Sequence, residues 1–188
     1  MAQLILIGPV GVGKTTTAQL LAEQLSLPHH VLDQLRWSYF QQIGYDPERV
    51  QQLVATQGIA AVLAHWERFE VHALEQVLKE YPTGVIDVGG GYTVASDPVL
   101  ARRIRQMLAP YPYVVLLLPA PELEASIQIL TERLAGQLPE DFPLQEHVRH
   151  HFGTQNLAKY VVYTYPKSPE AIRDEILWRL DGGLGASV

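Results

Sequence analysis

Short apolar runs alternate with longer amphipathic segments along the chain. A run such as 114–118 shows no polar alternation, which is typical of a parallel strand covered on both faces. Apolar residues three and four positions apart, as in 14–25 and 59–80, predict helices between these runs. The expected strands lie at residues 3–7, 30–32, 85–88, 114–118 and 160–164. The pattern therefore predicts an α/β fold, a three-layer α/β/α sandwich with a five-stranded parallel sheet.

Proline and glycine mark where several of these helices begin and end. Asp46-Pro47, Asp97-Pro98 and Ser168-Pro169 each place a capping side chain before a proline at the first helical position. Gly58 is expected to end the helix that follows the first of these pairs.

Length and charge narrow the class of protein. A chain of 188 residues with 47% hydrophobic content suits one globular domain, expected at residues 1–181 with a lid at about 135–155 and a flexible tail at 182–188. The net charge of −6 argues against nucleic acid and anionic membranes as partners. The chain has no cysteine, and no segment resembles a signal peptide or a membrane span, so a cytoplasmic location is expected.

One segment near the start carries phosphate-binding chemistry. Gly8-Pro-Val-Gly-Val-Gly-Lys-Thr matches the P-loop pattern G-x-x-x-x-G-K-[ST], between a predicted strand and a predicted helix. Backbone N–H groups and the positive helix end would cradle the phosphates, Lys14 would reach the β- and γ-phosphates, and the Thr15 hydroxyl would ligate Mg²⁺. A plain glycine turn explains Gly8 but not the Lys-Thr pair. The segment predicts a site for ATP or a close relative, of the P-loop NTPase type, formed by Gly8, Gly11, Val12, Gly13, Lys14, Thr15 and Thr16.

Asp87 is a second candidate for this chemistry, because it comes at the end of the apolar run at 85–88. A carboxylate in this place can hold a water molecule in the outer shell of the metal. It can equally cap the glycine-rich loop that follows. The sequence leaves both interpretations open.

Together these motifs resemble shikimate kinase and related small P-loop kinases. The resemblance rests on Gly8–Thr16, on Asp33 at the end of the second predicted strand, and on the run Gly84–Gly91 with its glycine triplet. Val114–Leu118 with the following Pro121-Glu122 resembles the family's fourth strand and turn, and Lys167–Glu170 resembles its adenine-holding loop. The resemblance is collinear over nearly the whole chain, and its specific parts are the P-loop and the triplet.

The resemblance implies phosphoryl transfer from ATP, with Mg²⁺, to a hydroxyl of a small molecule. In that family an aspartate after the second strand contacts the accepting hydroxyl, which gives this role to Asp33. The triplet would let the substrate approach the backbone, and the adenine loop would hold the base. The residues implied are Gly89, Gly90 and Gly91 for the substrate and Ser168 and Pro169 for the nucleotide.

The family's arginines for the substrate carboxylate are not matched. The helix that should supply one has Glu67 at the arginine's position, and Arg68 lies about 100° further around the helix. A second family arginine falls near Arg149-His150-His151, where the alignment with the family does not decide which residue corresponds to it. Because a bidentate guanidinium fork is hard to replace, the sequence predicts an acceptor other than shikimate.

A lid arginine would stabilise the charge of the transferred phosphoryl group. Arg133 is the first candidate and Arg149 the alternative, although a solvated helix face beside Glu132 also explains Arg133. His147, His150 and His151 share one helical face, which suits either metal ligation or a lid-facing helix.

Other residues near Asp33 have two interpretations each. Arg36 either pairs with an anionic group of the substrate or forms a surface ion pair. A set of aromatic residues either walls an acceptor pocket or packs in the core, and core packing is favoured. These are Trp37, Tyr39, Phe40, Tyr45, Trp66 and Phe69.

Functions from different classes fit these features. The first is a small-molecule kinase in which Lys14, Asp33 and Arg133 are catalytic. The alternative is a non-catalytic ATP-binding sensor or regulatory protein that acts through a protein partner. A nucleoside monophosphate kinase fits less well, because it needs several lid and acceptor-site arginines and the chain has only 14 lysines and arginines in all.

Overall fold

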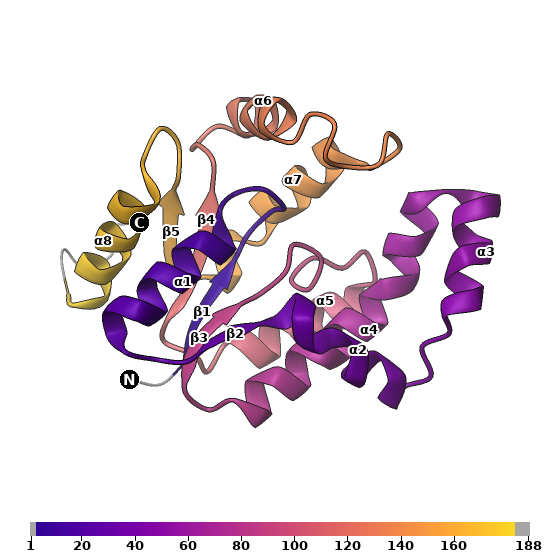
Figure 1. Cartoon of the computed structure of the whole chain (residues 1–188), viewed down its shortest axis with the longest axis horizontal. Coiled ribbons are helices and arrows are strands. Elements are labelled where there is room, and N and C mark those ends of the chain that lie inside the picture. The colour runs from indigo at the N-terminus through magenta and orange to yellow at the C-terminus, as the bar shows by residue number, and fades with distance from the viewer. Residues whose placement is uncertain (1–2, 183–188) are drawn as a thin grey trace.

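The computed structural model of the chain describes residues 3–182. Its centre is a five-stranded sheet in the order β2-β3-β1-β4-β5 (Figure 1). Every neighbouring pair is parallel, so the predicted α/β/α sandwich with a five-stranded parallel sheet is confirmed. The strands are β1 (Gln3–Ile7), β2 (His29–Val31), β3 (Gly84–Asp87), β4 (Val114–Leu118) and β5 (Tyr160–Tyr163).

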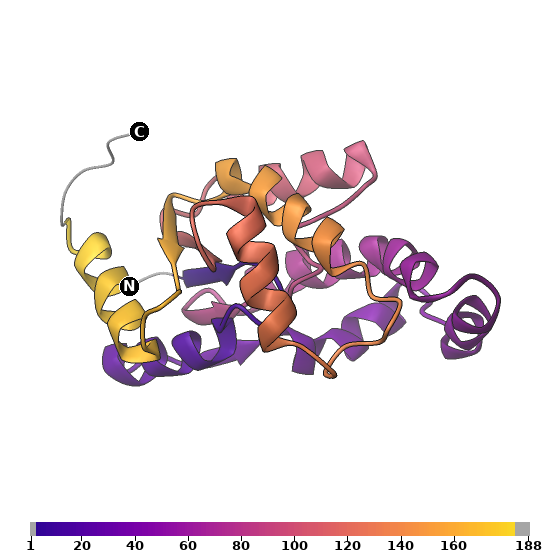
Figure 2. The ribbon, with the colours of Figure 1, turned by 90° about the horizontal axis from the view of Figure 1, so that it is seen from above.

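Helices cover both faces of this sheet, which explains the lack of polar alternation in its strands. Leu4 and Leu6 of β1 pack with α1 and α8, while Ile5 and Ile7 pack with α4 and α5. Figure 2 shows α1 on one side of β1 and α5 on the other. The helices are α1 (Lys14–Leu25), α2 (Leu32–Gln42), α3 (Pro47–Gln57), α4 (Ile59–Glu80), α5 (Pro98–Leu108), α6 (Leu123–Arg133), α7 (Leu144–Gly153) and α8 (Pro169–Leu180), with a short 3-10 helix at Gln155–Leu157.

The predicted helix caps are confirmed. The Asp46 carboxylate accepts a hydrogen bond from the Glu48 amide at 2.9 Å, and that of Asp97 accepts one from the Val99 amide at 2.7 Å. The hydroxyl of Ser168 caps α8 in the same way. Gly58 ends α3 as expected.

Strands β2 and β3 each begin and end one residue before the prediction, and β5 ends one residue early. The shift of β2 bears on the candidate site. This strand runs from His29 to Val31 because its partner β3 ends at Asp87, which pairs with Val31, and no further pairing is possible. Helix α2 begins directly at Leu32. Asp33 therefore lies in the first turn of this helix, just beyond the carboxyl end of the sheet.

The aromatic residues after Asp33 form mainly a core, as the favoured interpretation expected. Phe40 and Phe69 are fully buried, with ring centroids 5.4 Å apart, and Tyr45 packs edge-on against Phe69. These contacts join α2 to α4. Helix α3 extends away from the sheet at the right of Figure 1.

Helices α6 and α7 share a small core of their own, formed by Ile127, Leu130, Leu134 and Val148. The predicted lid at about 135–155 comprises the loop between these helices, all of α7 and the start of the 3-10 helix. No helix within residues 3–182 is both long and apolar enough to cross a bilayer. Of the predicted tail, residues 183–188 lie outside the described part of the chain.

Candidate active site

The P-loop connects the buried strand β1 to the start of α1. Gly8 has a φ of +143°, and a Cβ there would lie 2.3 Å from the carbonyl oxygen of Leu117 on β4. Only glycine fits this position, because the conformation is left-handed and the next strand is in contact. The loop therefore crosses closely over the carboxyl end of the sheet before α1 begins.

Lys14 is the buried cation of this loop. Its Nζ donates hydrogen bonds to the carbonyl oxygens of Gly8 and Pro9, both at 2.9 Å. Burial lowers its pKa to about 8, while the nearby charges of Asp87 and Asp33 act in the opposite direction. No carboxylate within residues 3–182 forms an ion pair with this ammonium group. A polyphosphate would supply the anionic partner that this buried charge needs.

Thr15 and Asp87 supply oxygen atoms of the kind Mg²⁺ prefers. Thr15 is exposed in the first turn of α1. Asp87 is only 3% exposed and pairs in register with Leu6 of β1, which places it beside the strand that leads into the P-loop. Its side chain makes no hydrogen bond to the residues described, so nothing there indicates a loop cap. The donor set suits Mg²⁺.

A cavity of about 340 Å³ adjoins the P-loop at Val10. Its walls come from α2, α4, the segment after β3 and the start of α7. Four of the predicted substrate residues line it, namely Asp33, Arg36, Gly90 and Gly91, whereas Gly89 does not. The structure thus brings most of the predicted acceptor site together next to the predicted phosphate site.

Asp33 is held in place from two sides. Its Oδ1 accepts a hydrogen bond from the Tyr92 hydroxyl at 3.1 Å and faces Arg36 Nη1 at 3.3 Å. The guanidinium of Arg36 also packs over the rings of Trp37 and Trp66, at 4.4 and 5.2 Å from their centroids. Both charges of this pair face the cavity, and each already has a partner.

Glu70 is a cavity residue that the sequence prediction missed. It lies on α4 among buried apolar residues and is only 7% exposed. Burial, reinforced by the charge of Asp33, raises the pKa of its carboxyl group to about 8. The signal was present in the sequence, because Glu70 falls on the apolar face that also carries Ala73, Leu74 and Val77.

The glycine triplet makes room for protein side chains as well as for the cavity. A Cβ on Gly89 would lie 2.7 Å from a carboxylate oxygen of Asp33, and a Cβ on Gly91 would lie 2.3 Å from one of Glu70. A Cβ on Gly90 would meet the His147 ring at 3.1 Å. The triplet therefore lets two carboxylates and an imidazole pack against the backbone.

Glu67, at the position of the family's arginine, fixes the segment beyond the triplet. Its carboxylate accepts hydrogen bonds from the Ser96 amide and hydroxyl, at 2.9 and 2.8 Å, and from the Asp97 amide. Arg68 lines a neighbouring hollow with Arg49 and does not line the acceptor cavity. At this point of the cavity the chain carries an anion that holds its own backbone in place.

Helix α7 docks onto the site through two histidines. His147 Nε2 accepts a hydrogen bond from the Val10 amide at 3.1 Å, and burial lowers the pKa of this ring to about 4. His151 is fully buried, with Nε2 2.8 Å from the carbonyl oxygen of Gly90. The part of the chain that the structure describes contains no group of three or more acidic or histidine side chains placed to hold a metal. These histidines connect α7 to the P-loop and to the triplet.

The two lid-arginine candidates lie in different places. Arg133 Nη1 donates a hydrogen bond to the Gly11 carbonyl at 2.9 Å, directly on the P-loop. Arg149 pairs with Glu124 on α6 at 3.2 Å and does not line the cavity. Of the two, Arg133 is the one that contacts the P-loop.

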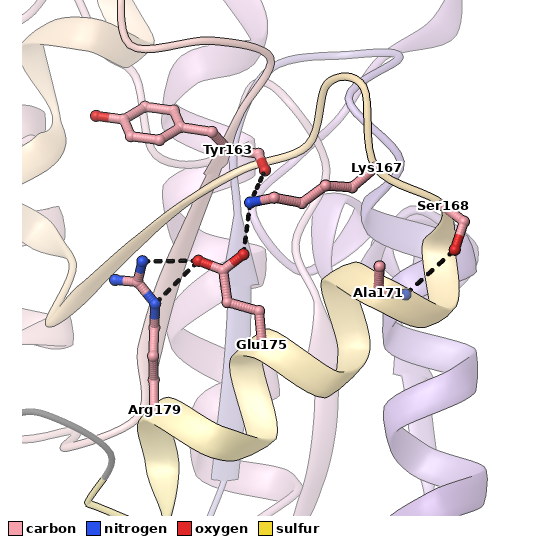
Figure 3. Close-up of polar contacts among 6 residues, drawn as sticks. All are labelled: Tyr163, Lys167, Ser168, Ala171, Glu175 and Arg179. Carbon is pink, nitrogen blue, oxygen red and sulfur yellow. Dashed lines mark hydrogen bonds and ion pairs between the residues drawn. The ribbon is translucent and has the colours of Figure 1, made fainter.

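The loop before α8 is fixed by the contacts drawn in Figure 3. Lys167 Nζ donates to the Tyr163 carbonyl at 2.8 Å and pairs with Glu175, which Arg179 also binds at 2.7 Å. Ser168 Oγ accepts a hydrogen bond from the Ala171 amide at 3.3 Å. Because all the strands are parallel, this loop leaves β5 at the same edge of the sheet as the P-loop.

Comparisons with known proteins agree with this geometry. The sequence model described as shikimate kinase matches residues 10–181. Shikimate kinase of Enterococcus faecalis is 29% identical over 188 residues, covering 96% of this chain and 99% of that protein. Shikimate kinase of Streptomyces coelicolor is 28% identical over 180 residues, covering 93% of this chain and 92% of that protein.

A solved structure gives the same picture of the fold. Shikimate kinase from Acinetobacter baumannii, in complex with shikimate, has a TM-score of 0.64 at 19% identity, and the match covers 98% of this chain and 96% of that one. The resemblance expected from the motifs is confirmed: the chain belongs to the shikimate kinase family.

Proposed function

We propose that this member of the family transfers the γ-phosphoryl group of ATP to a hydroxyl of a small molecule other than shikimate. The observation that carries the proposal is the cavity beside the P-loop, in which Asp33 faces the space where an acceptor would lie. Phosphate and acceptor sites that adjoin in this way suit direct transfer between bound reactants.

The nucleotide side of the reaction falls to the P-loop. Lys14 would leave the Gly8 and Pro9 carbonyls to bind the β- and γ-phosphates. Thr15 and, through water, Asp87 would hold Mg²⁺, which neutralises phosphate charge when bound. Ser168 and Pro169 would lie against the adenine.

On the acceptor side, Asp33 would orient the hydroxyl and take its proton. The acceptor oxygen forms a bond to the γ-phosphorus as the bond to the β-phosphate oxygen breaks, and ADP leaves. Arg133, which already contacts Gly11, would stabilise the charge on the transferred group. Closure of the lid at about 135–155 would exclude water from the phosphoryl group.

The charges of the cavity argue against shikimate as the acceptor. Among the described residues that line it, Arg36 is the one arginine, and it is already paired with Asp33. Glu67 stands at the arginine's position and would repel a carboxylate. A cavity of this composition favours an acceptor without an acidic group.

ADP release in the presence of Mg-ATP tests the proposal. Pools of sugars, hydroxy acids, amino alcohols and nucleotides would be supplied separately, with Lys14→Ala as the blank. We expect one pool other than the shikimate-containing one to accelerate ADP release by the wild-type chain. Tight ATP binding without any dependence on an acceptor would instead support the sensor or regulatory alternative.

A further inference from the structure

The acceptor cavity contains more anionic than cationic groups. Asp33, Glu67, Glu70 and Glu146 line it, against the single guanidinium of Arg36 among the residues described. His147 at the rim adds no positive charge, because burial lowers the pKa of this ring to about 4. Even while Glu70 holds its proton, a ligand of this cavity would meet a negative field from Asp33, Glu67 and Glu146.

Three of these charged groups are already engaged by the protein. Glu67 accepts hydrogen bonds from the backbone of Ser96 and Asp97. Asp33 and Arg36 pair with each other. These interactions satisfy the groups without any ligand.

Glu70 is different, because its carboxylate is buried and unpartnered. It is 7% exposed and lines the cavity, and within residues 3–182 no donor forms a hydrogen bond to it. The charged groups that face it are Asp33 and Arg36 on α2 and Glu67 on its own helix, while Tyr92 faces it from the loop after the triplet. A buried carboxyl group is costly to ionise without a donor, so it keeps its proton until a ligand supplies a charged donor that stabilises the carboxylate.

Glu70 and Asp33 share one wall of the cavity. Asp33 packs against Gly89 and Glu70 against Gly91, two positions along the same backbone segment. Extended backbone rises about 3.3–3.6 Å per residue, so the two carboxylates rest on sites about 7 Å apart at most. One small molecule can reach both.

We propose that the phosphoryl acceptor is an amino alcohol or amino sugar whose ammonium group binds Glu70 while its hydroxyl faces Asp33. This inference rests on the proposed function and names the substrate class of the same site. The ammonium donates hydrogen bonds to the Glu70 carboxylate and takes no part in bond making. The hydroxyl oxygen bonds to the γ-phosphorus, its proton passes to Asp33, and ADP is the leaving group.

Turnover by the full chain with Mg-ATP tests this assignment. The acceptors would be glucosamine, ethanolamine and 2-deoxystreptamine, their N-acetyl forms, and the hydroxy acids shikimate, quinate and gluconate. We expect an amine to exceed its N-acetyl form by about tenfold or more in kcat/KM, because a charge-assisted hydrogen bond to a buried carboxylate is lost on acetylation. Glu70→Gln should remove that preference and leave the KM for ATP within about twofold.

A matched control and a second readout keep the test decisive. Glu75→Gln changes a glutamate on the same helix that pairs with Lys79 and Arg103 outside the cavity, and it should leave the preference intact. Calorimetric titration of the amine in phosphate and Tris buffers at pH 7 should detect proton release on binding, which Glu70→Gln should abolish.

The outcomes separate this inference from the proposed function. Phosphorylation of quinate, gluconate or an N-acetylated compound in preference to every amine would overturn the inference and leave the kinase proposal standing, whereas preferred phosphorylation of shikimate would overturn both. An amine preference that survives in Glu70→Gln would also overturn it. Failure of these three classes would overturn the inference, and failure of the sugar and nucleotide pools as well would overturn the proposed function with it.

Discussion

The amide of Val10 donates a hydrogen bond to Nε2 of His147 at 3.1 Å, which joins the P-loop to a helix 137 residues further along the chain. The same ring fills the space beside Gly90. Because Nε2 is the acceptor, the ring is neutral, in keeping with its pKa of about 4. Helix α7 and the phosphate loop are thus held together by a buried imidazole.

His147→Ala should lower the free energy of unfolding by about 1–3 kcal/mol, because it leaves the Val10 amide without its acceptor and opens a cavity next to Gly90. Urea denaturation followed by circular dichroism measures this. His150→Ala, an exposed position on the same helix, should cost about 0.5 kcal/mol or less. Equal losses in the two variants would show that the contact with Val10 contributes nothing.

The buried carboxyl group of Glu70 predicts a pH dependence of stability. Its pKa in the folded chain is about 8, above the ordinary 4.5, so the folded state binds the proton more tightly than the unfolded state. Wild-type stability should therefore fall as the pH rises from about 4.5 to about 8, by up to about 1.4 kcal/mol per pH unit from this group.

Glu70→Gln removes this contribution, so its stability relative to wild type should increase across the same pH window. Thermal or urea denaturation at several pH values would follow the difference. Glu75→Gln should show no such rise, because hydrogen bonds from Lys79 and Arg103 lower the pKa of Glu75. A stability difference for Glu70→Gln that stays constant with pH would contradict the buried, raised-pKa state of this group.

Gly91→Ala should destabilise the fold through Glu70. The new Cβ would lie 2.3 and 2.6 Å from the two carboxylate oxygens, which forces the side chain to move at a cost of about 1–3 kcal/mol. Gly153→Ala is the matched control, since a Cβ there meets nothing within 4 Å. In a Glu70→Ala background the cost of Gly91→Ala should largely disappear, and additive effects in this double-mutant cycle would rule out the contact.

Asp33→Asn should reduce turnover by on the order of a hundredfold or more while ATP affinity stays nearly unchanged, because the base is lost and the P-loop is untouched. The amide oxygen can still accept the hydrogen bond from Tyr92 Oη, so the fold should persist. Steady-state kinetics and nucleotide titration together measure both quantities. An unchanged rate would remove Asp33 from the mechanism.

Local patterns were enough to predict the fold and the place of the P-loop segment between β1 and α1. Strand apolarity, the Asp-Pro and Ser-Pro caps and the P-loop depend on neighbours in the chain, and the structure has them as expected. The end of β2 was missed because it depends on where β3 stops, a contact between distant segments.

The acceptor site was predictable only in part. Asp33, Gly90 and Gly91 line the cavity as the family resemblance implied, and Arg36, singled out from its place after Asp33, lines it as well. Glu70 was overlooked although a lone acidic residue on an apolar helix face signals a special environment. The role of His147 toward Val10 could not be read from the sequence, because no local pattern tells which loop α7 docks against.

Phosphorus NMR of the full chain with Mg-ATP and pooled acceptors tests the central claim most directly. We expect a new phosphate-monoester resonance that grows in step with ADP in at least one pool and is absent with Lys14→Ala. ATP bound by the wild-type chain with no new monoester in any pool would contradict it.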